Sequence, residues 1–168
     1  VLQQCKAVKE VSHGKLFTMS EIGYLALRYN HREMQAALRS PYLDAWGPAP
    51  GYTNRGPGDD IPDNAPVASL KHAGKVWMFQ ADVRSHLAGS HLKRFGDTAN
   101  ADESVAVYLR EMGHYMTGGA IPYHWTFNTW YRDEKIMSVV RKFDFLMQLS
   151  SHFPRHSTAE IALVLDPL

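Results

Sequence analysis

The chain contains a single cysteine, Cys5, among 168 residues, so an internal disulfide is excluded. It lacks any apolar run close to the roughly 18 residues of a membrane-spanning helix, so no membrane partner is expected. It also lacks an excess of charge of one sign, because 18 basic residues stand against 17 acidic ones and the basic ones are scattered. Since nucleic-acid binding depends on a strong basic excess, we expect no nucleic-acid partner.

The sequence also lacks the spacings that mark common metal and catalytic sites. Nine histidines are present, but none forms a His-Glu-x-x-His motif, and a single cysteine argues against a structural zinc site. The glycines form no Gly-x-Gly-x-x-Gly phosphate loop, and no Gly-x-Ser-x-Gly elbow of a serine hydrolase occurs. We therefore expect no metal and no cofactor.

What the chain does have is the composition of an ordinary globular domain, with 45% hydrophobic and 21% charged residues. Apolar runs typical of strands alternate with amphipathic patterns typical of helices. Such alternation predicts an α/β fold with a parallel sheet. We predict strands at 15–25, 43–46, 76–81, 120–127 and 161–165, and helices at 1–13, 30–39, 101–117 (capped by Asn100) and 134–150.

Three segments between these elements are polar or rich in Gly and Pro. Residues 47–64 and 85–100 are predicted to be long loops, and loops of that length in a compact domain are often functional. Residues 151–158 contain Pro154 and are predicted to be a linker.

The strand at 76–81 is followed by polar side chains at alternate positions, Gln80, Asp82 and Arg84. If extended geometry persists, these three side chains share one face at the carboxyl end of the strand. Barrels of the α/β class carry their chemistry at that end. The plainer alternative is an ion pair between Asp82 and Arg84 that only orders the following loop.

Aromatic residues stand at the ends of two other predicted strands. Trp125, preceded by Tyr123 and His124, closes the strand at 120–127, and Trp46 closes the strand at 43–46. Aromatic rings at a barrel mouth can stack on the apolar face of a ligand, so Trp125, His124 and Trp46 are candidate substrate-binding residues. A tryptophan in a strand is as often a core residue.

Three further residues are candidates for the rim of a binding site. Tyr52 and Arg55 lie in the long loop, where Arg55 could instead pair with Asp59 or Asp60 to fold that loop. Glu21 lies near the end of the first predicted strand and could reach a ligand at the barrel mouth, although a solvated loop carboxylate is the commoner outcome.

The segments SPYLDAW (40–46), PGYTNRGPG (50–58) and GKVWMFQADVRS (74–85) together resemble family 42-type glycoside hydrolases, which include β-galactosidases. The helix with Asp102-Glu103-Ser104 and the closing segment AEIALVLD (159–166) fit the same pattern. The resemblance implies a (β/α)₈ barrel of which residues 1–150 would supply strands five to eight. Residues 159–168 would then begin a second α/β domain of the kind that associates with trimerisation.

The resemblance further implies that the chain is part of a longer protein. The acid/base glutamate of such enzymes ends strand four, which would lie upstream of Val1. The expected partners are a carbohydrate, and either further copies of the chain through the second domain or the other half of the barrel.

Position 80 departs from the family, because the pattern there has a glutamate nucleophile and this chain has Gln80. An uncharged amide is a very poor nucleophile for attack on an anomeric carbon. Three explanations stay open: an engineered replacement that traps substrate, a natural non-catalytic relative, or a shifted register in which Asp82 or Glu21 carries the charge.

The sequence therefore favours a glycoside hydrolase-like protein that acts on or binds a β-galactoside-type sugar, by a retaining mechanism in the intact family. The alternative is a non-catalytic relative that binds carbohydrate or serves as a scaffold. An unrelated α/β enzyme is a third possibility, since a fold does not fix a function.

Overall fold

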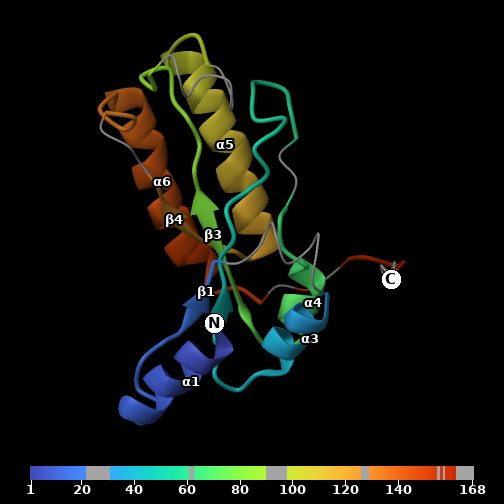
Figure 1. Ribbon diagram of the computed structural model, residues 1–168. Helices are drawn as coiled ribbons and strands as arrows, with labels where there is room; N and C mark the ends of the chain where they lie inside the picture. The colour runs from blue at the N-terminus through green and yellow to red at the C-terminus, as the bar shows by residue number, and fades with distance from the viewer. Residues whose placement is uncertain are drawn as a thin grey trace.

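The computed structural model describes residues 1–21, 31–60, 63–89, 98–125, 129–154, 156 and 158–161. Helices and strands alternate along the described chain (Figure 1). They are α1 (Leu2–Val11), β1 (Met19–Ser20), α3 (His31–Arg39), β2 (Ala45–Trp46), α4 (Val67–His72), β3 (Val76–Ala81), α5 (Ala101–Gly118), β4 (Ile121–His124) and α6 (Glu134–Ser150). None of the helices within these ranges is long and apolar enough to cross a membrane.

The four strands form one sheet in which every pair is parallel and the spatial order β1-β2-β3-β4 follows the chain. The predicted α/β class with a parallel sheet is therefore confirmed. The register aligns Ala45 with Val76, Met78 with Ile121, and Gln80 with Tyr123. Aligned residues point to the same face, so the register sorts the side chains of the sheet into two sets.

One set faces the helices. Trp46, Trp77 and Phe79 are each at most 2% exposed and belong to a single hydrophobic core that also takes residues from α1, α3, α4, α5 and α6. The rings of Phe79 and Tyr115, from β3 and α5, lie 3.7 Å apart. Gly118 is needed at the end of α5, because a Cβ there would lie 2.6 Å from the Trp77 ring.

The other set forms what we call the open face: Met19, Ala45, Val76, Met78, Gln80, Ile121 and Tyr123. None of these residues belongs to the main hydrophobic cluster, although Ala45 is fully buried. Ile121 is 51% exposed, Gln80 is 9% exposed, and Met19, Val76, Met78 and Tyr123 are half-buried. The five described helices thus contribute to a core on one side of the sheet, whereas the opposite side keeps a partly exposed surface.

Helices and strands that the sequence marks strongly match the structure. The bounds of β3 and α6 agree with the predicted 76–81 and 134–150. Asn100 caps α5 by accepting a hydrogen bond from the Glu103 N–H, as predicted.

The differences concern short elements. The predicted strands at 15–25 and 43–46 are reduced to two residues each in β1 and β2, with residues 22–25 outside the described part. Helix α4 was not predicted, because it has only six residues and follows Pro66 in a segment that looks like loop. The predicted strand at 161–165 lies almost wholly outside the described residues.

A candidate binding site at the carboxyl edge of the sheet

Four groups, one from each strand or the residue that follows it, meet at the carboxyl edge of the sheet; we call them the edge cluster. The Tyr123 hydroxyl lies 3.0 Å from Glu21 Oε1, 3.2 Å from the Gly47 carbonyl oxygen and 3.3 Å from Gln80 Oε1. Glu21 follows β1, Gly47 follows β2, Gln80 belongs to β3 and Tyr123 to β4. Two predicted site residues, Glu21 and Gln80, are therefore brought together by a residue that the sequence did not single out.

The contact between Tyr123 and Glu21 has a consequence for the shape of the sheet. Strands β1 and β4 are its two outer strands, and three strand spacings in a flat sheet amount to about 14 Å. Side chains that project in parallel from the outer strands of a flat sheet cannot touch over that distance. The sheet is therefore curved toward the open face, so that groups from its two outer strands converge.

The phenol of Tyr123 serves this cluster as a neutral hydrogen-bond donor. Burial, together with the hydrogen bond to the Glu21 carboxylate, raises the pKa of Tyr123 well above its usual value. Gln80 is 9% exposed and its amide is held beside the phenol, whereas the Glu21 side chain is exposed. The cluster thus offers a solvent-facing carboxylate next to a protonated phenol and an amide.

Asp82 and Arg84 do not continue the face of Gln80. A tight turn, closed by a 2.8 Å hydrogen bond from the Asp82 N–H to the Gln80 carbonyl, ends the extended geometry at this point. Both side chains are nearly buried, at 3% and 6% exposed. The expectation that Gln80, Asp82 and Arg84 project together is therefore wrong, because the backbone turns as soon as β3 ends.

Asp82 instead forms a buried charged cluster with two arginines. Arg55 Nη1 lies 3.1 Å from Asp82 Oδ2 and Arg84 Nη2 lies 3.9 Å from the same oxygen. Burial lowers the pKa of Arg84, and the neighbouring Asp82 opposes that effect. The predicted ion pair between Asp82 and Arg84 exists, but Arg55 makes the closer contact. The alternative pairing of Arg55 with Asp59 or Asp60 is wrong, because the guanidinium turns inward to Asp82.

Arg55 also fixes the loop that carries Tyr52. It donates further hydrogen bonds to the carbonyl oxygens of Pro50, Gly51 and Asp82, at 3.0, 2.5 and 2.8 Å. The Tyr52 ring lies over the Arg55 guanidinium, 4.2 Å from centroid to Cζ, and the residue is 44% exposed. A partly exposed aromatic ring is thus held rigidly on a buried charged base beside the end of β3.

Helix α5 holds the same loop from the other side. Arg110 Nη1 donates hydrogen bonds to the carbonyl oxygens of Gly56 and Asp59, at 2.7 and 2.5 Å. His114 Nε2 lies 2.9 Å from Asp63 Oδ1, and this contact raises the pKa of His114. Nothing in the sequence predicts these anchors, because their partners are backbone carbonyls or loop carboxylates more than 50 residues away.

The remaining predicted aromatic residues separate into two groups. Trp125 directly follows β4 at the carboxyl edge, where its backbone N–H donates a hydrogen bond to the Ala81 carbonyl oxygen. The residue is 40% exposed. Trp46 is a core residue on the helix side of the sheet. His124 also faces that side, 3.3 Å from the Tyr131 hydroxyl, and burial lowers its pKa. The edge therefore presents Trp125 and Tyr52, whereas Trp46 and His124 lie away from it.

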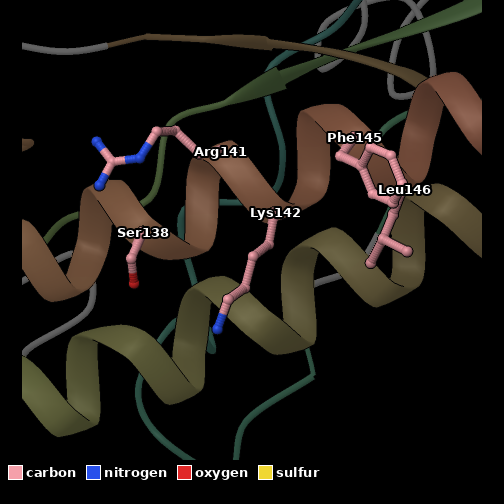
Figure 2. Close-up of a pocket in the computed structure, with 5 residues that line it drawn as sticks. All are labelled: Ser138, Arg141, Lys142, Phe145 and Leu146. Carbon is pink, nitrogen blue, oxygen red and sulfur yellow. The ribbon is translucent and has the colours of Figure 1, made fainter.

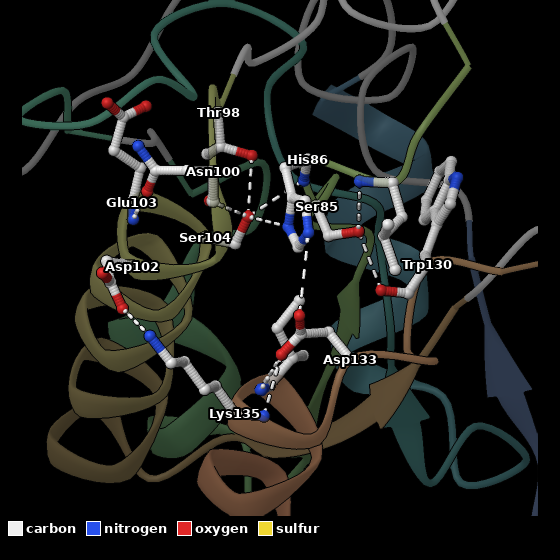
Figure 3. A network of polar contacts seen from close by, with 12 residues as sticks. Ser85, His86, Thr98, Asn100, Asp102, Glu103, Ser104, Trp130, Asp133 and Lys135 are labelled. Carbon is white, nitrogen blue, oxygen red and sulfur yellow. Dashed lines mark hydrogen bonds and ion pairs between the residues drawn. The ribbon is translucent and has the colours of Figure 1, made fainter.

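A second polar network has the outline of a catalytic triad (Figure 3). His86 Nδ1 lies 3.1 Å from Ser104 Oγ, and His86 Nε2 lies 3.7 Å from Asp133 Oδ2. Ser104 is fully buried, however, and its oxygen also contacts Thr98 and the Asn100 carbonyl. Because no substrate can reach a fully buried hydroxyl, we interpret the network as a brace between the first turns of α5 and α6.

Two other features of the described residues bear on function. Within those residues, no group of three or more His, Cys, Asp or Glu side chains is placed to hold a metal ion. A hollow of about 560 Å³ lies on the outer side of α6, lined by Ser138, Arg141, Lys142, Phe145 and Leu146 (Figure 2). It is formed by different residues from the edge cluster.

Comparison of the chain with models of protein families, with curated proteins and with solved structures found no match.

Proposed function

We propose that this chain is one half of a (β/α)₈ barrel similar to that of family 42-type glycoside hydrolases, with β1 to β4 as barrel strands five to eight. Three observations support the barrel. The strands are parallel and follow one another in chain order, the helices contribute to a core on one side only, and the sheet curves away from that core. A closed barrel of eight parallel strands has these three properties.

We propose that the carboxyl edge binds a β-galactoside-type sugar. Carboxylate, amide and phenol groups provide donors and acceptors for sugar hydroxyls at the edge cluster. Trp125 and Tyr52 add partly exposed aromatic rings that can stack on the apolar face of a sugar. The observation that carries the proposal is the Tyr123 hydroxyl, which joins groups from all four strands into one polar floor.

We further propose that the chain as it stands binds the sugar without hydrolysing it. Retaining hydrolysis needs two carboxyl groups roughly 5–5.5 Å apart across the glycosidic bond. Position 80 offers an amide, and Asp82 is buried against Arg55. Glu21 is then the one solvent-facing carboxylate of the edge cluster among the described residues. Residues 151–158 as a linker and 159–168 as the start of an oligomerising domain belong to the same proposal.

Binding is tested by titrating methyl β-galactoside into the full-length protein in a calorimeter. We expect saturable binding that Trp125→Ala and Glu21→Gln weaken, whereas Ala68→Asp, on the exposed side of α4, leaves it unchanged. The absence of binding to galactosides and to other common monosaccharides would refute the proposal.

Hydrolysis is tested separately with 4-nitrophenyl β-galactoside. Its leaving group is weakly basic and depends little on a general acid, so the assay reports mainly on the nucleophile. We expect no turnover by the protein itself and measurable turnover by Gln80→Glu. Turnover at an ordinary enzymatic rate by the unaltered protein would show that another residue is the nucleophile.

A further inference from the structure

The Glu21 carboxylate carries a charge that the described residues do not neutralise. It lies 3.0 Å from the Tyr123 hydroxyl and is exposed to solvent. In the part of the chain that the structure describes, no Lys, Arg or His forms an ion pair with it. Asp82, the other carboxylate at this edge, is buried against Arg55 instead. The edge cluster therefore presents one negative charge to whatever binds there.

The edge cluster also has a surplus of hydrogen-bond acceptors. Oxygens of Glu21, Gly47 and Gln80 all lie within 3.3 Å of the Tyr123 phenol oxygen, and the phenol has a single proton to donate. The Gln80 amide can turn to donate one N–H to the phenol, but its own oxygen is then left to accept a hydrogen bond from elsewhere. A ligand that completes the cluster must therefore bring donors.

A protonated amine matches both the charge and the surplus of acceptors. An ammonium group has one positive charge, three N–H donors and no acceptor, whereas a sugar hydroxyl has one donor and no charge. The acceptors surround one phenol oxygen, so they lie close enough together for a single nitrogen to contact more than one of them. A divalent metal ion prefers several carboxylates, and no such group of ligands occurs among the described residues.

Trp125 places an aromatic ring beside the cluster. Its backbone N–H donates to the Ala81 carbonyl oxygen, which extends the pairing of β4 with β3 by one residue. Residues two apart in a strand share a face, so Trp125 follows Tyr123 on the face of the edge cluster. The ring is 40% exposed, and an indole attracts a cation as well as the apolar face of a sugar.

We infer that the edge cluster recognises an amino sugar, a β-galactosaminide with a free amino group, in preference to the neutral galactoside. The inference rests on the proposed function, in which position 80 lies beside the anomeric carbon. The substituent that meets the cluster is then the one on the neighbouring ring carbon, where a galactosaminide carries its amine. The ammonium group donates to Glu21 and to the carbonyl oxygen of Gln80 or Gly47, while Trp125 stacks on the sugar ring.

The inference is tested by calorimetric titration of the full-length protein with methyl β-galactosaminide and methyl β-galactoside at about pH 6, where the amine is protonated. We expect the galactosaminide to bind about five- to tenfold more tightly, because a charge-assisted hydrogen bond is stronger than a neutral one but this carboxylate is exposed to water. High salt should reduce this preference by screening the charge, and should change galactoside binding much less.

Glu21→Gln keeps the size of the side chain and removes its charge. We expect this variant to bind the two sugars within about twofold of each other, because the remaining acceptors are neutral. Glu134→Gln is the matched control, since that carboxylate lies on α6 with its side chain 82% exposed, and it should keep the full preference. Thermal melts show whether each variant is folded, and the salt series on the unaltered protein decides the question if Glu21→Gln is not.

The outcomes separate this inference from the proposed function. A preference for the galactosaminide that Glu21→Gln abolishes supports the inference. Equal affinities, tighter binding of the galactoside, or a preference that persists in Glu21→Gln overturns it, and in each case galactoside binding itself stands. Binding of the galactosaminide alone supports the inference and contradicts the binding of neutral galactosides, whereas binding of neither sugar overturns both.

Discussion

The guanidinium of Arg55 offers the sharpest test of how the site is held. It donates hydrogen bonds to the carbonyl oxygens of Pro50, Gly51 and Asp82 and lies 3.1 Å from the Asp82 carboxylate, all in a buried setting. Arg55→Ala removes every one of these contacts. It leaves a buried carboxylate whose closest cation is Arg84, at 3.9 Å.

The expected cost can be estimated from that geometry. Removing one partner of a buried ion pair typically costs about 3–5 kcal/mol, because the other charge stays buried without compensation. Since a domain is stable by only about 5–15 kcal/mol, we expect Arg55→Ala to lower the free energy of unfolding by about 3–5 kcal/mol. For a chain of this size the melting temperature should fall by about 6–20 °C.

Urea unfolding followed by tryptophan fluorescence measures this loss. Arg141→Ala is the control, because Arg141 pairs with Glu134 at the surface, where both side chains are more than half exposed, so its removal should cost less than about 1 kcal/mol. A double-mutant cycle with Asp82→Asn should give a coupling energy above about 1 kcal/mol. A loss of less than about 1 kcal/mol for Arg55→Ala, or additive effects of the two substitutions, would refute the reasoning.

Three further predictions follow from the same contacts. Trp125→Ala should weaken galactoside binding by about tenfold in a calorimetric titration, since one stacking ring contributes on the order of 1 kcal/mol, whereas Trp125→Phe should retain most of the affinity. Asn100→Ala should cost about 1 kcal/mol of stability in urea unfolding through loss of the α5 cap, and Asn100→Ser should restore it. The pKa of His114 is raised in the folded state, so the stability due to its contact with Asp63 is complete below the pKa of an unfolded histidine, about 6.5, and is lost as pH rises through the folded-state pKa. Asp63→Asn should therefore destabilise the protein more at acidic than at alkaline pH, and an equal effect at both would contradict that contact.

The fold was predictable where the local sequence by itself marks a helix or a strand. Helix α6 has a clear apolar stripe and an Asp133 cap, and β3 is a run of apolar residues bounded by Gly74, so both bounds matched the sequence. The sequence predicts longer strands than β1 and β2, because an apolar run does not show how many of its residues pair with a neighbouring strand. Helix α4 was missed because six residues are too few to show a helical period.

The candidate site was predictable only in part, because its geometry depends on register and on contacts between distant segments. Gln80, at the end of β3, and Glu21 both contact the Tyr123 hydroxyl, as candidates for one site should. The sequence does not state how neighbouring strands align, so it could not show that Trp46 faces the helices. It also could not show that Arg55 would reach Asp82 rather than the aspartates of its own loop.

The identity of residue 80 is best understood from the hydrogen-bond count around Tyr123. The phenol has one proton, but three oxygen acceptors lie within 3.3 Å of it, on Glu21, Gly47 and Gln80. Turning the Gln80 amide about its last bond would place an N–H donor toward the phenol oxygen and leave the phenol proton for Glu21. A glutamate at position 80 has no such donor when ionised and would add a second negative charge beside Glu21. The amide of Gln80 therefore suits the neighbours that this chain provides, whereas an ionised glutamate at the same position would not.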